Sequence, residues 1–266
     1  MKKIIASLLA ALLILSVFTG CSSLGITPLK EIKYEVAEDH VVVKELPDRT
    51  NNQVITIDDE YEGKPVTEIA DFAGCNLENV EKIVIGKNVE KIGEWAFTNN
   101  QKLTGFEISE ENESFCTVGG AIFTKDMKTI LFYPCNGKKT FAIPDSVEVI
   151  RSKAFYKCGK LENVTLPASL VTIEEKAFFG CEKIGNVTLA DTVETIAKDA
   201  FTNCKELTKI EIPASIKTIG EYAFFNCTKL LDIKVNAKES EISLGKEWQP
   251  TDNGIAIGEL KITFEK

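Results

Sequence analysis

Hydrophobic residues recur along this chain with a period much longer than that of a helix or a strand. The segments FYKC, FFGC, FTNC and FFNC occupy residues 155–158, 178–181, 201–204 and 224–227, a step of 23 residues, and an Ala precedes each. Degenerate copies, FAGC and FTNN, begin at Phe72 and Phe97, a step of 25 residues. From Phe97 to Phe155 the step is 58, one repeat with an insert of 35 residues. Repetition at such a period is typical of solenoid proteins.

Each copy contains one short alternating segment. In Leu161-Glu-Asn-Val164-Thr-Leu166 every second or third residue is apolar, which favours a half-buried strand. The same pattern predicts strands at 103–108, 207–213 and 230–235 and, more weakly, at 184–189. Pro167 ends its strand because proline has no N–H to donate. A second apolar pair, Leu170 and Ile173, follows, and then a polar turn with room for one turn of α- or 3₁₀-helix.

A unit of this size cannot enclose a core of its own, but stacked units can. The apolar positions would then form continuous columns, with successive strands about 4.8 Å apart and parallel. We expect the repeated aromatic rings to stack in one column, made of Phe72, Phe97, Phe155, Phe178, Phe201 and Phe224. The pattern therefore predicts a repeat solenoid with short parallel strands and irregular, β-rich caps at both ends.

The residues between the apolar positions of each strand should face outward and align from coil to coil. We call these two columns the strand ribbon. One column is Val84, Glu107, Ala142, Thr165, Thr188, Glu211 and Lys234, and the other is Lys82, Gly105, Thr140, Asn163, Asn186, Lys209 and Asp232. We expect ligand contacts on this surface, at Glu107, Asn163, Thr165, Asn186, Thr188, Lys209, Glu211, Asp232 and Lys234. The insert at 113–139, with Phe115, Phe123, Phe132 and Tyr133, is a second candidate because long insertions on regular scaffolds often carry function.

The repeat resembles the BspA-type leucine-rich repeats of bacterial surface proteins. The resemblance lies in a strand ending in Pro, followed by Val-x-x-Ile-x-x-x-Ala-Phe-x-x-Cys, and it covers about 54–235. Residues 61–69 resemble the family's N-terminal lead-in, and 119–134 resemble a long repeat variant. The resemblance implies a leucine-rich-repeat fold, exposure at the cell surface and adhesion to a host or neighbouring-cell ligand, and it brings no catalytic residue.

The first residues indicate export. Lys2 and Lys3 precede an apolar run from Ile4 to Phe18, a pattern typical of a secretory signal and shorter than the roughly 20 residues of a spanning helix. Thr19-Gly20-Cys21 resembles the lipobox of bacterial lipoproteins, which implies lipid attachment at Cys21. An ordinary signal peptide is the alternative. We expect a signal peptide at 1–20, a tether at 21–33 and a repeat domain at 34–266, with caps at about 34–57 and 236–266 and repeats at about 58–235.

The composition of the chain limits the partners and the kinds of catalytic or metal site that it can have. The chain has 31 Lys and Arg; without Lys2 and Lys3 the remaining 29 face 40 acidic residues, a net charge of −11 that disfavours nucleic acid and anionic membranes as partners. His40 is the one histidine, so a zinc site or a Ser-His-Asp triad would have to be built around it. The seven cysteines after Cys21 are an odd number, which favours buried thiols over a complete disulfide set. We expect no catalytic residue, metal or cofactor.

These features predict an exported lipoprotein, anchored in the cell membrane by lipid alone and facing away from the cytoplasm. Its expected function is adhesion or interaction through binding of a protein or glycan ligand. A structural component of the envelope is the alternative. An enzyme or enzyme-accessory protein has the least support, because no pair of carboxylates stands out from the solvated acidic loops.

Overall fold

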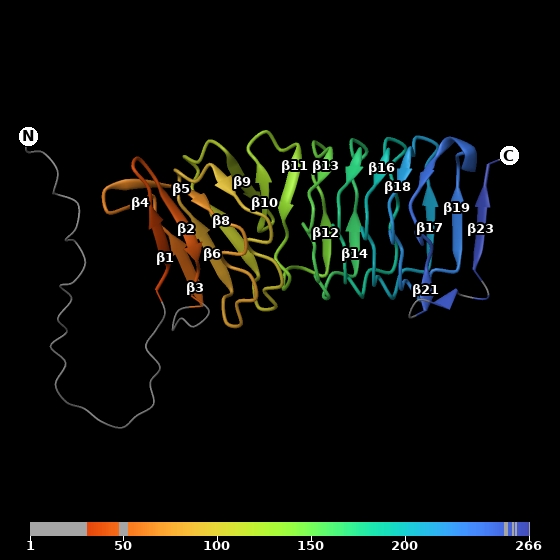
Figure 1. Ribbon diagram of the computed structural model, residues 1–266, viewed down its shortest axis with the longest axis horizontal. Helices are drawn as coiled ribbons and strands as arrows, with labels where there is room; N and C mark the ends of the chain where they lie inside the picture. The colour runs from red at the N-terminus through yellow and green to blue at the C-terminus, as the bar shows by residue number, and fades with distance from the viewer. Residues whose placement is uncertain (1–30, 48–52, 253–254, 257, 259, 266) are drawn as a thin grey trace, which may run out of the picture.

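The protein is an elongated stack of β-coils, and the first and last described strands lie at opposite ends of the stack (Figure 1). The computed structural model describes residues 31–47, 53–252, 255–256, 258 and 260–265. The expected signal peptide, Cys21 and most of the expected tether lie outside the described residues. Within them, no helix has the length and apolar character needed to cross a membrane.

One long side of the stack carries the alternating segments as parallel strands, which confirms the predicted pairing (Figure 1). Three groups follow one another along this side: β3 (Val54–Ile57), β6 (Lys82–Ile85) and β8 (Gly105–Ile108); β12 (Thr140–Ala142) and β14 (Asn163–Thr165); β17 (Lys209–Ile212), β19 (Asp232–Val235) and β23 (Lys261–Phe264). Inward residues such as Ile210 and Ile233 are buried, while their neighbours are exposed.

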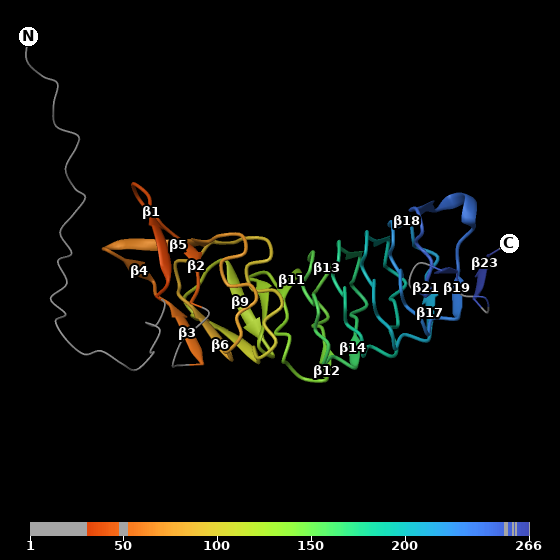
Figure 2. The same cartoon turned by 60° about the horizontal axis from the view of Figure 1, so that its bottom comes forward.

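A second sheet runs along the opposite side (Figure 2). Its strands are β9 (Phe115–Val118), β10 (Ala121–Thr124), β11 (Thr129–Phe132), β13 (Val149–Ile150), β15 (Thr172–Ile173), β16 (Thr195–Ile196), β18 (Thr218–Ile219) and β20 (Ser243–Leu244). From β13 to β18 each strand of this sheet has only two residues. The second residue of each strand, such as Ile173 in β15, is also the second member of the second apolar pair of its repeat. The sequence predicted buried residues there but no strand, because two residues are too few to show an alternation.

The ends differ from the middle, as the terminal coils of a solenoid must. At the N-terminal end lie β1 (Lys33–Val36), β2 (Val41–Glu45), β4 (Glu60–Tyr61), β5 (Lys64–Ile69) and β7 (Lys91–Ile92). At the C-terminal end lie the 3₁₀-helix η1 (Glu239–Glu241) and the pair β21 (Thr251–Asp252) and β22 (Ile255–Ala256). The range 34–57 expected for the N-terminal cap holds most of β1, all of β2 and, on the ribbon side, β3, with a turn between β1 and β2.

The Ala-Phe segments form successive turns instead of a helix. In most coils two residues four apart have positive φ, for example Lys153 (63°) and Lys157 (55°), or Lys176 (57°) and Gly180 (71°). A left-handed residue interrupts an α-helix, so the space expected for one helical turn holds two tight turns. The backbone of each turn bonds to the next coil, as in Phe155 N–H to Ala177 O at 2.8 Å.

An aromatic column runs through the C-terminal half of the core, as predicted. Phe155, Phe178, Phe201 and Phe224 are fully buried, and their successive ring centroids are 4.7, 5.2 and 5.5 Å apart with nearly parallel planes. Tyr133 extends the column at one end, 5.0 Å from Phe155. Trp248 covers the other end, with its ring edge-on to Phe224.

The prediction that the column continues to Phe97 and Phe72 was wrong. Phe97 is buried in the separate N-terminal core, where its ring packs against Phe106 and Phe132. Phe72 is not a core residue. Its side chain is 57% exposed, and its backbone amide bonds to Glu94 O, which aligns Phe72 with Trp95, 23 residues later. The position equivalent to Phe97 is Gly74. A Cβ on Gly74 would lie 2.7 Å from Leu46 Cδ1, so Leu46 fills the space that a ring would need. The first coil thus has the regular 23-residue step, and the step of 25 came from matching the wrong aromatic residue.

Four cysteines occupy one repeat position and are fully buried thiols: Cys158, Cys181, Cys204 and Cys227. Cys181 Sγ donates to Phe155 O at 3.0 Å, and Cys227 Sγ donates to Phe201 O at 3.0 Å. Asn100, the last residue of the copy FTNN, takes this position in its own coil, donating to Gly74 O and accepting from Leu77 N, both at 2.7 Å. Cys75, expected here, lies outside the column because its coil is shifted by two residues relative to the expected alignment.

The insert joins two hydrophobic cores. Phe123, Ile130 and Tyr133 pack in the C-terminal core with the aromatic column, whereas Phe115 and Phe132 pack in the N-terminal core with Phe97. Strands β10 and β11 therefore lie between the cores with both faces buried. All four aromatic residues that made the insert a candidate binding site are at most 6% exposed, so none offers a surface anchor.

Candidate functional site: the strand ribbon

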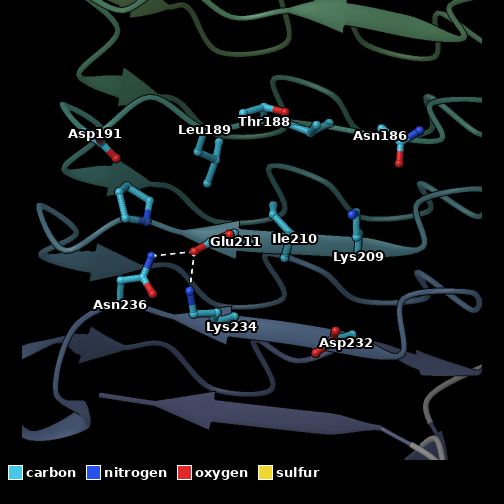
Figure 3. A pocket seen from close by; sticks show the side chains of 12 residues that line it. Asn186, Thr188, Leu189, Asp191, Lys209, Ile210, Glu211, Asp232, Lys234 and Asn236 are labelled. Atoms are coloured by element: carbon cyan, nitrogen blue, oxygen red, sulfur yellow. Dashed lines mark hydrogen bonds and ion pairs between the residues drawn. The ribbon is translucent and has the colours of Figure 1, made fainter. Parts of the chain in front are cut away.

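The two columns of the strand ribbon form in the predicted register. Thr140 pairs with Asn163 and Ala142 with Thr165; Lys209 pairs with Asp232 and Glu211 with Lys234. In the N-terminal group Val84 pairs with Glu107. The nine residues singled out from the sequence are all exposed, and those from Asn186 to Lys234 lie on one surface in Figure 3. The fold thus brings them to one side of the molecule, although more than 120 residues separate the first from the last.

Charges on the ribbon are paired between neighbouring coils. Lys82 Nζ lies 2.6 Å from Glu107 Oε1, and Lys234 Nζ lies 2.5 Å from Glu211 Oε1. Asn236 Nδ2 also donates to Glu211, at 2.9 Å. The hydrogen bond from Asn236, and after it the one from Lys234, hold the pKa of the Glu211 carboxyl below its ordinary value. Both donors bond to the same carboxylate oxygen, Oε1.

The sheet is interrupted in the middle of the C-terminal half. The predicted strand at 184–189 does not form, and only an isolated bridge joins Asn186 to Asn163. The weak pattern has a physical origin: Ala190 and Asp191 stand where the neighbouring coils have Pro167-Ala168 and Pro213-Ala214, and Gly185 lies within the segment. Without full pairing to β14 or β17, this coil leaves gaps in the ribbon on both of its sides.

A hollow of about 460 Å³ lies between this coil and β17 (Figure 3). Ribbon residues line it on three coils, together with Asp191, Pro213 and Asn236. A second hollow of about 440 Å³ lies between the same coil and β14, lined by Asn163, Thr165, Asn186 and Thr188 among others. A third, of about 470 Å³, is lined by Lys234, Asn236 and Thr263 among others. Because neighbouring hollows share lining residues, they make one shallow groove lined by both polar and apolar side chains, which we call the ribbon groove.

The sequence missed part of this site and one further surface. Asp191 and Asn236 lie beyond the alternating segments, so no periodic signal marked them. Phe72, Trp95, Tyr156 and Phe179 form a row along the turns outside the core, with centroid distances of 6.1, 4.9 and 5.2 Å. The alignment of Phe72 with Trp95 is the sequence signal that would have revealed this aromatic row.

The chemistry available on the ribbon is that of recognition. Hydroxyls, amides and paired charges can donate to and accept from a polar ligand, while apolar Val187, Leu189 and Ile210 line the floor of the first hollow. Among the described residues, no group of three His, Cys, Asp or Glu side chains is placed to hold a metal ion. His40 lies far from the ribbon groove in sequence, at the N-terminal end, where its Nδ1 is 2.7 Å from Asp39.

Solved structures with the same fold include the pneumococcal vaccine antigen PcpA, at 25% identity and a TM-score of 0.66; the match covers 77% of this chain and 50% of the antigen. A leucine-rich repeat protein from Eubacterium ventriosum matches at 20% identity and a TM-score of 0.56, over 70% of this chain and 59% of that one. One from Bacteroides ovatus matches at 22% identity and a TM-score of 0.51, over 90% and 70%. This chain thus spans only about half the length of the pneumococcal antigen. No curated protein sequence matches it.

The family comparison agrees with the repeat and the fold. Residues 63–130 and 125–245 match the family described as BspA type leucine rich repeat region, in six copies. The matched part includes the insert, the whole sheet from β9 to β20 and the first two hollows of the ribbon groove, and it is well over half of the chain. The protein is a member of the BspA-type leucine-rich repeat family.

Proposed function

We propose that this protein is an exported, lipid-anchored surface protein that binds a protein or glycan ligand along the strand ribbon. Its family consists of leucine-rich repeat surface proteins, which are often adhesion or interaction modules. The observation that carries the proposal is the ribbon groove, a run of three hollows lying on exposed, in-register columns.

The ribbon groove favours an extended ligand with many polar groups. Its lining combines hydroxyl, amide and charged side chains with apolar ones, and the two columns of the strand ribbon contain no aromatic residue of the kind that makes a tight hot spot. Each contact should therefore be weak. Many copies tethered to one surface by Cys21 would raise the effective concentration of binding sites, so that many weak contacts together bind the ligand strongly.

The binding test compares the two sheets. Thr165→Lys with Thr188→Lys places two long charged side chains over the hollows on either side of the interrupted coil. The matched control is Thr172→Lys with Thr195→Lys, because these threonines are paired in register on the opposite sheet. Immobilised matrix proteins and a glycan array serve as probes. For a probe bound by the original chain, we expect the ribbon pair to weaken binding about tenfold, or about 1.4 kcal/mol, and the control pair to leave it unchanged. Equal effects of the two pairs would refute the ribbon as the site.

The anchor is tested separately. The protein should fractionate with membranes, and Cys21→Ser should release it or block its processing, because two or more acyl chains are needed for stable anchoring. Mass spectrometry of the N-terminus is the measurement. An unmodified N-terminus at another residue would exclude the lipid anchor without bearing on the ribbon.

A further inference from the structure

The last strand, β23, leaves one edge of its sheet unpaired. It pairs in parallel with β19, and among the described residues nothing pairs with its other edge (Figure 1). The apolar columns end here half-buried: Leu244, Leu260, Ile262 and Phe264 are all partly exposed. One coil earlier, Ile233 and Val235, which pair with Ile262 and Phe264, are 0% and 1% exposed. The core is thus open to a further layer at this end.

The direction of the free backbone groups follows from the bonds on the other side. Lys261 N–H donates to Leu231 O at 2.9 Å, and Glu265 N–H donates to Val235 O at 3.1 Å. Since backbone groups alternate in direction along a strand, Thr263 also faces β19, and Ile262 and Phe264 present their N–H and C=O groups to the open edge. An added strand must therefore bond to these two residues.

The sequence of β23 is self-complementary when it is read antiparallel about Thr263. In that register Ile262 lies opposite Phe264 of the second strand, so the free N–H and C=O groups of both residues meet as a hydrogen-bonded pair. On the outer face Lys261 lies opposite Glu265, and Thr263 lies opposite itself. On the inner face the half-buried Ile262 and Phe264 cover each other. A shift by two residues would keep the hydrogen-bond pattern but would place Thr263 opposite a charged residue and lose both ion pairs.

We propose that β23 joins two copies of this chain tail to tail. The two strands form an antiparallel pair about a two-fold axis at Thr263, and the sheet with its inner apolar column continues from one copy into the other. Charged residues at an edge strand usually discourage pairing. Here the two charges are opposite in sign and placed symmetrically about Thr263, so a second copy in this register is attracted. The proposal does not depend on a ligand for the strand ribbon.

A charge exchange tests the register. The protein is purified as cells produce it, in a mild detergent, and its mass is followed by sedimentation over a range of concentrations. Lys261→Glu places Glu opposite Glu265 at both ends of the pair and should raise the dissociation constant of the dimer about 5- to 30-fold. Glu265→Lys should have the same effect. The double variant, with both residues exchanged, should restore the original dissociation constant.

A crosslink tests the axis. In this register Thr263 faces Thr263 of the second copy as a non-hydrogen-bonded pair. The Cα atoms of such a pair are about 4.5 Å apart, so two cysteines there can form a disulfide. Thr263→Cys should give a covalent dimer on mild oxidation, whereas Thr165→Cys, in the middle of the strand ribbon, should not. A protein that stays monomeric at all concentrations would overturn the proposal. So would a dimer that is indifferent to the charge exchange, or one that Thr263→Cys fails to crosslink.

Discussion

Phe201 and Phe72 belong to the same repeated pattern in sequence but to different environments in the fold. Phe201 is fully buried between Phe178 and Phe224, whereas Phe72 is 57% exposed. Phe201→Ala should lower the free energy of unfolding by about 3–5 kcal/mol, because a buried ring leaves a cavity. Phe72→Ala should lower it by less than about 1 kcal/mol. Urea denaturation of both variants measures the difference, and similar losses would contradict the column.

The same two residues show what the sequence could and could not predict at this scale. Four regular copies fixed the alignment of Phe155 to Phe224, and the copy FTNN aligned Asn100 with the repeated Cys. In the first coil an aromatic residue stands two positions before the place of the core ring, and Leu46 from the N-terminal cap fills that place instead. A contact from another element decided the alignment, so no local pattern could have shown it.

The buried thiols should be unreactive while the protein is folded. Burial raises the pKa of the Cys158 and Cys204 thiols well above the ordinary value, and only the thiolate reacts. Raising the pH should therefore leave the reaction of the Cys158 and Cys204 thiols slow, whereas partly exposed Cys75 is open to the reagent. Titration with a chromogenic disulfide should find the remaining thiols after denaturation. Only one reactive thiol in the denatured, unreduced protein would show that disulfides are present.

At the scale of the element, the turns contain backbone strain that can be removed. Lys157 has a φ of 55°, and the equivalent residue of the next coil is Gly180, with a φ of 71°. Non-glycine residues are disfavoured in this conformation. Lys157→Gly should therefore raise the free energy of unfolding by up to about 1 kcal/mol, whereas Lys160→Gly, at an exposed position without positive φ, should lower it. Thermal unfolding of the two variants checks the sign. Destabilisation by both would mean that the turn carries no such strain.

Element patterns also explain which half of the candidate site was predictable. The ribbon columns follow directly from the alternation of apolar and polar residues along each strand, which has a period of two residues. Every exposed residue singled out on the columns therefore lies where expected. The ribbon groove could not be foreseen, because it arises from the failure of 184–189 to pair with its neighbours. Ala190 stands where the neighbouring coils have Pro, and this difference is a sequence feature that indicated the failure. The width of the gap depends on the positions of β14 and β17.

At the scale of the whole molecule, a contact outside the core ties the two halves together. Lys153 Nζ lies 2.9 Å from Glu94 Oε2 and 4.4 Å from the Trp95 ring, and Trp95 packs edge-on against Tyr156. Trp95→Ala should weaken this junction and let the N-terminal core unfold before the C-terminal core. We expect two transitions in urea where the original chain has one. Tyr222→Ala, at the same turn position far from the junction, is the control and should keep one transition.

The stacking of coils has a mechanical consequence. Hydrogen bonds between parallel strands run along the axis of the stack, so tension between its ends separates one coil after another instead of shearing all of them together. Each released coil of 23 residues adds about 76–83 Å of extended chain. Against steady pulling, as in flowing fluid, the protein should lengthen stepwise and recover when the tension falls. It would act on the surface as an extensible spring.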